Sequence, residues 1–134
     1  MTAYVDSSAL LKRYVVEHDS DRADELLASD LVLATSWVTV VEVRRNLGRL
    51  LTAAACADAR AQFHIDLDSL ALISCDEAVS RAAADIGEML GVRSLDAIHL
   101  ASAQRLQIPG LTFITFDLRQ AQAGRTLGFT VLGA

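Results

Sequence analysis

Large aromatic side chains, prolines, cysteines and lysines are all scarce in this chain of 134 residues. Aromatic residues make up 5% and hydrophobic residues 52%, so Leu, Val, Ile and Ala must supply the core, which suits helices packed on a parallel sheet. Cys56 and Cys75 form no C-x-x-C or Cys/His cluster, and we expect both to be reduced and buried. The length predicts a single domain, residues 1–134.

Membrane and export signals are also absent. No apolar run approaches the roughly 18 residues of a membrane helix, and the opening "MTAYVDSSALLKR" has an acid where a signal peptide is basic. We therefore expect a cytoplasmic protein with no membrane partner. The net charge of −5 argues against a uniformly basic surface for nucleic acid. Acids that converge on a metal site would nevertheless leave the remaining surface less acidic.

Short apolar runs alternate with helical patterns, which predicts an α/β fold with a largely parallel sheet. Strands are predicted at residues 3–5, 31–35, 71–74, 112–115 and 130–132. Helices are predicted at residues 8–17, 21–28, 37–51, 76–90, 94–106 and 118–128, with residues 52–70 helical in two segments. Ser7 or Ser8 is expected to cap the first helix, and Ser94 is expected to cap the helix predicted at residues 94–106.

Two predicted strands are each followed by an aspartate, Asp6 after "AYV" and Asp117 after "TFIT". Either residue can serve simply as a helix N-cap. In open parallel sheets, however, the functional crevice lies beyond the carboxyl ends of the strands, where the strand order reverses. If the two strands are neighbours there, the two carboxylates meet.

Two further acids extend this pattern. Asp96 falls in the first turn of its predicted helix, where a carboxylate also complements the helix dipole. Glu42 interrupts the apolar stretch "VTVVEV" and lies either on a narrow solvent-exposed stripe of its predicted helix or against a cation. Four carboxylates in one crevice require protons or metal ions. Oxygen ligands suit Mg²⁺ or Mn²⁺, whose bound water can hydrolyse a phosphodiester.

Four segments resemble, in order, the motifs of the PIN-domain ribonucleases, most closely the VapC-type toxins of type II toxin-antitoxin modules. They are "YVDSSALLK", "TVVEVRRNL", "GVRSLDAIHLASA" and "FITFDLRQAQAGRTLGFTVL". The resemblance covers nearly the whole chain. It implies a three-layer α/β/α sandwich around a five-stranded parallel sheet.

The resemblance also implies a site and an activity. The implied Mg²⁺ or Mn²⁺ site is formed by Asp6, Glu42, Asp96 and Asp117, supported by the hydroxyls of Ser8 and Thr115. The implied activity is endonucleolytic cleavage of RNA, which inhibits translation and growth when the toxin is free. The implied partners are a second copy of the chain and a cognate VapB-type antitoxin that covers the site, in a hetero-oligomer.

Three nearby residues receive other interpretations. His99, three residues after Asp96, is either a metal ligand or a packing histidine that donates to a backbone group or a carboxylate, and oxygen-rich ligation favours the packing role. Trp37 is predicted to be a core residue or an interface anchor. Arg93 either contacts RNA phosphate or antitoxin acids, or is a solvated surface residue.

Other classes of function remain as alternatives. A catalytically silent binding subunit would not need all four acids. A phosphotransfer domain of the haloacid-dehalogenase type needs an Asp two positions after its nucleophile, but Ser8 occupies that position. A receiver domain needs a Lys after a late strand, but Lys12 is the only lysine in the sequence. A purely structural module would leave Glu42 and Asp117 unexplained. The sequence therefore favours the nuclease.

Overall fold

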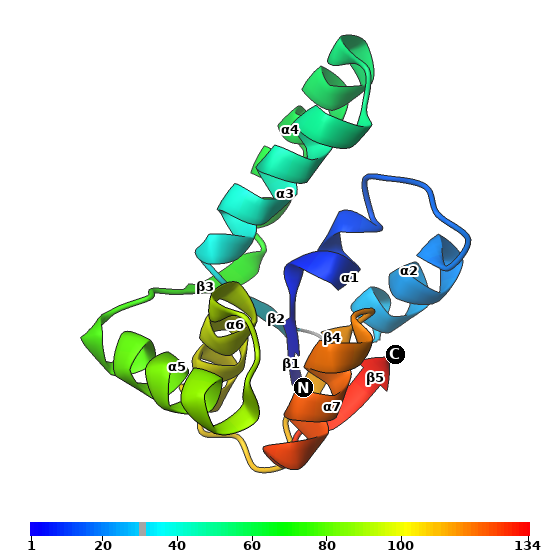
Figure 1. Cartoon of the computed structure of the whole chain (residues 1–134). Coiled ribbons are helices and arrows are strands. Elements are labelled where there is room, and N and C mark those ends of the chain that lie inside the picture. The colour runs from blue at the N-terminus through cyan, green and yellow to red at the C-terminus, as the bar shows by residue number, and fades with distance from the viewer. Residues whose placement is uncertain (30–31) are drawn as a thin grey trace.

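The computed structural model describes residues 1–29 and 32–134, and its centre is a parallel sheet (Figure 1). The strands are β1 (Thr2–Val5), β2 (Val32–Ser36), β3 (Leu70–Ile73), β4 (Thr112–Thr115) and β5 (Thr130–Gly133). Their order is β3-β2-β1-β4-β5, and every neighbouring pair is parallel. Leu31, which the sequence analysis places in the second strand, lies outside the described residues.

Helices connect the strands. They are α1 (Ser7–Leu11), α2 (Ser20–Ala28), α3 (Val38–Leu50), α4 (Ala53–Leu67), α5 (Glu77–Leu90), α6 (Ser94–Gln104) and α7 (Leu118–Thr126). Within the described ranges, none of these helices has the length and apolar character required to cross a membrane.

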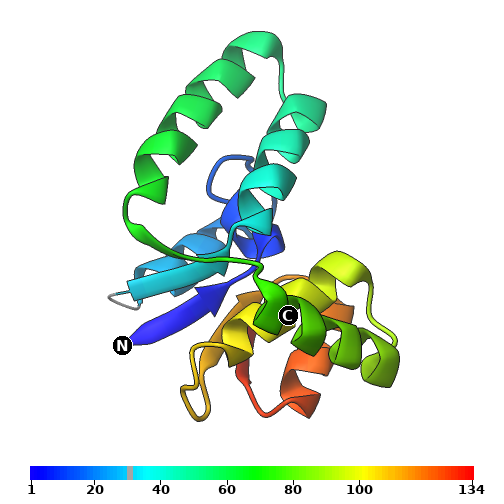
Figure 2. The ribbon, with the colours of Figure 1, turned by 90° about the vertical axis from the view of Figure 1, so that its left-hand side faces the viewer.

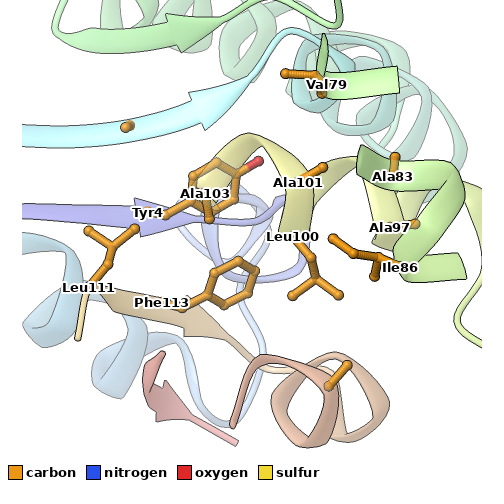
Figure 3. Close-up of a cluster of buried hydrophobic side chains, with 12 residues drawn as sticks. Tyr4, Val79, Ala83, Ile86, Ala97, Leu100, Ala101, Ala103, Leu111 and Phe113 are labelled. Carbon is orange, nitrogen blue, oxygen red and sulfur yellow. The ribbon is translucent and has the colours of Figure 1, made fainter. Parts of the chain in front are cut away.

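The sheet separates two hydrophobic cores because successive side chains of a strand point to opposite faces. In β1, Ala3 and Val5 pack with α1, α2, α3 and α4, whereas Tyr4 packs with α5, α6 and α7. Figure 3 shows the second of these cores, where Tyr4 and Phe113 of neighbouring strands lie beside Leu100 of α6. The structure thus confirms the predicted α/β/α sandwich around five parallel strands.

Helices α3 and α4 form a hairpin that extends away from the sheet (Figures 1 and 2). At the base of α3, Trp37 is 50% exposed, and Val41 is 68% exposed. A core position for Trp37 is therefore wrong, and its alternative role as an interface anchor stays a prediction. Helix α4 is continuous where two segments were predicted, because its alanine-rich sequence contains no Gly or Pro between residues 53 and 67.

Two helix starts differ from their predictions. Asp6, not Ser7 or Ser8, caps α1, because its carboxylate accepts the N–H of Ala9 at 3.2 Å. Ser94 is the first residue of α6, and the preceding residue occupies the cap position without a side-chain bond. The predicted start and end of α5 are confirmed by the Asp76 cap and the left-handed Gly91.

Helix α1 is also shorter than predicted, ending at Leu11. The chain then turns so that the buried Lys12 ammonium pairs with Asp19 at 2.7 Å and Glu17 at 3.1 Å. The prediction that both cysteines are buried is wrong as well: Cys56 is half-buried and Cys75 is exposed. Neither outcome follows from local pattern, because each depends on what packs against the residue.

Candidate active site

The strand order reverses between β1 and β4, which are hydrogen-bonded neighbours. Asp6 directly follows β1, and Asp117 lies two residues beyond β4, so both stand at the carboxyl edge of the sheet at its switch point. Both also cap helices, since Asp117 accepts the N–H of Gln120 at 3.0 Å. The two interpretations of these residues are therefore compatible: the caps fix the carboxylates at the switch point.

Asp6 is the most enclosed of the four acids, at 3% exposure. Its Oδ1 accepts the hydroxyl of Ser8 at 2.6 Å, and its Oδ2 accepts the hydroxyl of Thr115 at 2.5 Å. Burial raises the pKa of Asp6, and this rise is opposed by the electrostatic effect of the His99 side chain and by the hydrogen bonds to the carboxylate. A cation beside Asp6 would favour its ionised form further.

Arg93 joins two of the other acids. Its Nε lies 3.1 Å from Asp96 Oδ2, and a terminal nitrogen lies 3.6 Å from Asp117 Oδ2. The Asp96 carboxylate, followed by Asp117, raises the pKa of Arg93, and Glu42 adds to the effect. The side-chain amide of Gln120 donates to the Asp96 carbonyl at 3.1 Å, which ties α7 to α6. The two acids are thus held from separate helices around one guanidinium.

Beside this ion pair lies a hollow of 380 Å³ between α6 and α7. Arg93 and Asp96 line it together with Arg119, Gln122 and other residues. Arg93 is 72% exposed, so its contact with the acids faces solvent. This edge of the site is open to an incoming ligand.

Glu42 reaches the same region from α3. Its Oε1 lies 2.7 Å from Nε2 of His99, and Nδ1 of His99 lies 2.7 Å from the hydroxyl of Tyr4. His99 contacts a carboxylate, as the sequence analysis expected of a packing histidine. That carboxylate belongs to Glu42, 57 positions away in the chain, a pairing that no local sequence pattern predicts.

The chemistry of the donors fits a hard divalent cation, because the four side chains offer carboxylate oxygens only. Each carboxylate is already neutralised or hydrogen-bonded within the chain, by Arg93, by His99 or by the hydroxyls around Asp6. Across residues 1–29 and 32–134, no three His, Cys, Asp or Glu side chains are arranged closely enough to hold an ion together. An ion bound between Asp96 and Asp117 would compete with the Arg93 guanidinium for these two carboxylates.

Comparison with known proteins identifies the family. The sequence pattern of the PIN domain matches residues 3–125. The chain is 37% identical over 131 residues to ribonuclease VapC46 of Mycobacterium tuberculosis, which covers 96% of this chain and 95% of that protein. The chain belongs to the PIN-domain family. Ribonuclease VapC47 of the same species is 32% identical over 130 residues and covers 94% of this PIN domain and 92% of its own length.

Solved PIN-domain structures share the fold. The FitAB complex bound to a DNA fragment superposes with a TM-score of 0.77, at 18% identity, over 98% of this chain and 94% of that one. VapC20 of Mycobacterium tuberculosis, described as a toxin that cleaves the sarcin-ricin loop, superposes with a TM-score of 0.71 at 21% identity, over 92% and 95% of the two chains. At these identities the similarity establishes the arrangement of the sheet and helices.

In this PIN domain Ser8 and Thr115 contact Asp6, Asp96 and Asp117 contact Arg93, and Glu42 contacts His99. The sequence analysis missed the pairing of Arg93 with the acids of its own chain. Its spacing of three residues from Asp96 on the same helical turn was the available signal. It also missed Tyr4, because a tyrosine inside a short apolar strand looks like an ordinary core residue.

Proposed function

We propose that this PIN-domain protein is a metal-dependent endoribonuclease that acts as a toxin and is inhibited by a cognate antitoxin. The observation that carries the proposal is the position of Asp6 and Asp117 at the switch point, with Asp96 held beside Asp117 by Arg93. Relatives named as ribonucleases, at 37% and 32% identity over almost the full length, support the reaction class.

In this proposal Asp6 and Asp96 are the main ligands of Mg²⁺ or Mn²⁺, and Asp117 is an outer ligand. Glu42 binds through water or orients the attacking water. When bound, a divalent cation lowers the pKa of water and stabilises negative charge on phosphate oxygens. Ser8 and Thr115 hold the Asp6 carboxylate in one orientation through their hydroxyls. Arg93, once released from its acids, is available to a phosphate of the RNA backbone.

The proposed partners are an RNA substrate, a second copy of the chain and a VapB-type antitoxin, acting in the cytoplasm. Support for the antitoxin comes from solved structures with the same fold. One of them is the VapBC2 complex of Rickettsia felis bound to promoter DNA, with a TM-score of 0.70 at 13% identity. Another is the DNA-bound VapBC complex of Salmonella typhimurium, with a TM-score of 0.68 at 17% identity.

The decisive experiment is cleavage of total cellular RNA by the purified, antitoxin-free protein. With Mg²⁺ or Mn²⁺ we expect discrete cuts, and we expect EDTA and Asp96→Asn each to abolish them. Asp85→Asn, the same change at an exposed position of α5, should leave cleavage unchanged. A folded protein that cuts no RNA with either ion, or an Asp96→Asn variant with wild-type activity, would contradict the proposal.

The Arg93 contact leads to a prediction about ion binding itself. Arg93→Gln removes a positive charge from between Asp96 and Asp117, so Mn²⁺ affinity, measured by titration calorimetry, should rise about two- to fivefold, the range for one solvent-exposed charge. Arg81→Gln, on the exposed face of α5, is the matched control. Equal or weaker Mn²⁺ binding by Arg93→Gln would show that Arg93 does not compete with the ion.

A further inference from the structure

We infer that His99, held in turn by Tyr4, is a positioning residue that fixes the orientation of the Glu42 carboxylate. The inference rests on the proposed function, because it treats Glu42 as part of the nuclease site. It adds two residues that touch neither RNA nor ion and act only through Glu42. The chain of contacts runs from β1 through α6 to α3.

Both contacts are short, the one between Tyr4 and His99 is buried, and the one between His99 and Glu42 is partly buried. The Tyr4 hydroxyl lies 2.7 Å from His99 Nδ1, and His99 Nε2 lies 2.7 Å from Glu42 Oε1. Tyr4 is fully buried, and His99 is 1% exposed. Each ring nitrogen of this buried histidine therefore has one protein group to satisfy it.

The donors and acceptors fit one arrangement. The backbone N–H of Ser36 donates to the Tyr4 oxygen at 3.1 Å, which leaves the Tyr4 O–H free to donate to His99 Nδ1. An imidazole that accepts at Nδ1 carries its proton on Nε2, where it donates to the Glu42 carboxylate.

The rings themselves are held in place. Tyr4 stacks on Phe113, with centroids 5.1 Å apart, and meets the His99 ring edge to face at 5.9 Å. Figure 3 shows Tyr4 and Phe113 side by side in this core. Tyr4 also lies two residues before Asp6 on the same strand. One rigid strand end thus orients two of the four acids, Asp6 directly and Glu42 through His99.

The physical benefit is preorganisation. A glutamate side chain has three rotatable bonds, and ordering it at the moment of reaction carries an entropic cost. A hydrogen bond from a buried, correctly protonated histidine orders Glu42 in the folded state beforehand, as outer-shell partners do for other acidic and metal sites. Loss of such a partner commonly lowers activity or ion affinity by about 10- to 100-fold.

Nitrogen NMR of the metal-free, ¹⁵N-labelled protein tests the arrangement without any cleavage assay. We expect the His99 ring, assigned by loss of its signals in His99→Gln, to be the neutral Nε2–H tautomer. Tyr4→Phe should shift the Nδ1 resonance, and Glu42→Ala should shift the Nε2 resonance. A Nδ1–H tautomer, a doubly protonated ring, or resonances unmoved by both substitutions would overturn the inference.

A mutant cycle tests the positioning role. Tyr4→Phe and His99→Gln should slow single-turnover cleavage by about 10-fold or more, with little change in KM. In the Glu42→Ala background the same substitutions should cause no further loss, because they act through Glu42. The matched control is His64→Gln, at an exposed position of α4. Equal losses in both backgrounds would show a general structural effect and overturn the positioning role.

The two proposals fail separately. If the wild-type protein cuts no RNA while the NMR spectra show the Nε2–H tautomer, the nuclease proposal fails and the contact between His99 and Glu42 stands. If the protein cuts RNA but the cycle is additive, the nuclease proposal stands and the positioning role fails. Thermal melting of each variant separates both results from loss of the fold.

Discussion

Replacing Asp6 by asparagine is expected to slow RNA cleavage by more than about 100-fold, beyond the loss typical of an outer-shell residue. The amide cannot supply the negative charge that a divalent cation requires. The fold should persist, since the amide oxygen can accept from Ser8 and Ala9, and the amide nitrogen can donate to the Thr115 oxygen. Cleavage of a labelled RNA fragment measures the rate, and Asp85→Asn is the control.

The same substitution should also change the pH dependence of stability. Burial places the folded-state pKa of Asp6 above its ordinary value of 3.8. Between the two pKa values the folded protein binds more protons than the unfolded chain, so the free energy of unfolding decreases as pH rises through that window. Above it, the ionised Asp6 destabilises the metal-free protein.

We therefore expect metal-free Asp6→Asn to melt at a higher temperature than the wild type at pH 7.5, and the difference to shrink as pH falls toward 4. Circular dichroism melting in EDTA measures both proteins across this range. A variant that cleaves at the wild-type rate would contradict the proposed role of Asp6. A pH-independent difference in melting temperature would contradict the account of its burial.

The largest effect on stability is expected from Phe113→Ala. Phe113 is fully buried and stacks on the rings of Tyr4 and Phe129, at centroid distances of 5.1 and 5.5 Å. Its truncation should lower the free energy of unfolding by about 3–5 kcal/mol. That is a large share of the roughly 5–15 kcal/mol that stabilises a typical domain.

Urea denaturation measures this change, and Leu118→Ala, at an exposed position of α7, should remain within about 0.5 kcal/mol of the wild type. A loss below about 1 kcal/mol for Phe113→Ala would mean that the surrounding core collapses around the deletion. Phe113 also supports the Tyr4 ring. We therefore expect Phe113→Ala to impair the positioning of Glu42 even in the variant molecules that remain folded.

The strands and most helix ends were predictable because they depend on neighbours in the sequence. The apolar runs at residues 112–115 and 130–132 became β4 and β5, and the helix predicted at residues 76–90 became α5, which lies between the Asp76 cap and Gly91. The site was predictable in part. The acids at strand ends followed from the alternating pattern, but the adjacency of β1 and β4 required the strand order.

The errors share one cause. Trp37 is half-exposed and Cys75 is exposed, although a core position was one alternative for Trp37 and burial was predicted for Cys75. Helix α1 ends at Leu11, before its predicted end, where the chain turns and Lys12 pairs with Glu17 and Asp19. Each outcome depends on which distant surface a side chain meets, and a local pattern carries no information about that surface.

The sequence by itself determined the α/β class, the four acidic motifs and the PIN-domain family, since these are properties of local periodicity and of residues in order. Only the tertiary structure decided how each acid is held: Asp6 by Ser8 and Thr115, Asp96 and Asp117 by Arg93, and Glu42 by His99. The decisive contacts span large separations, 109 positions from Thr115 to Asp6 and 95 from Tyr4 to His99. Hydrogen bonds act over about 3 Å, so only the folded chain selects these partners.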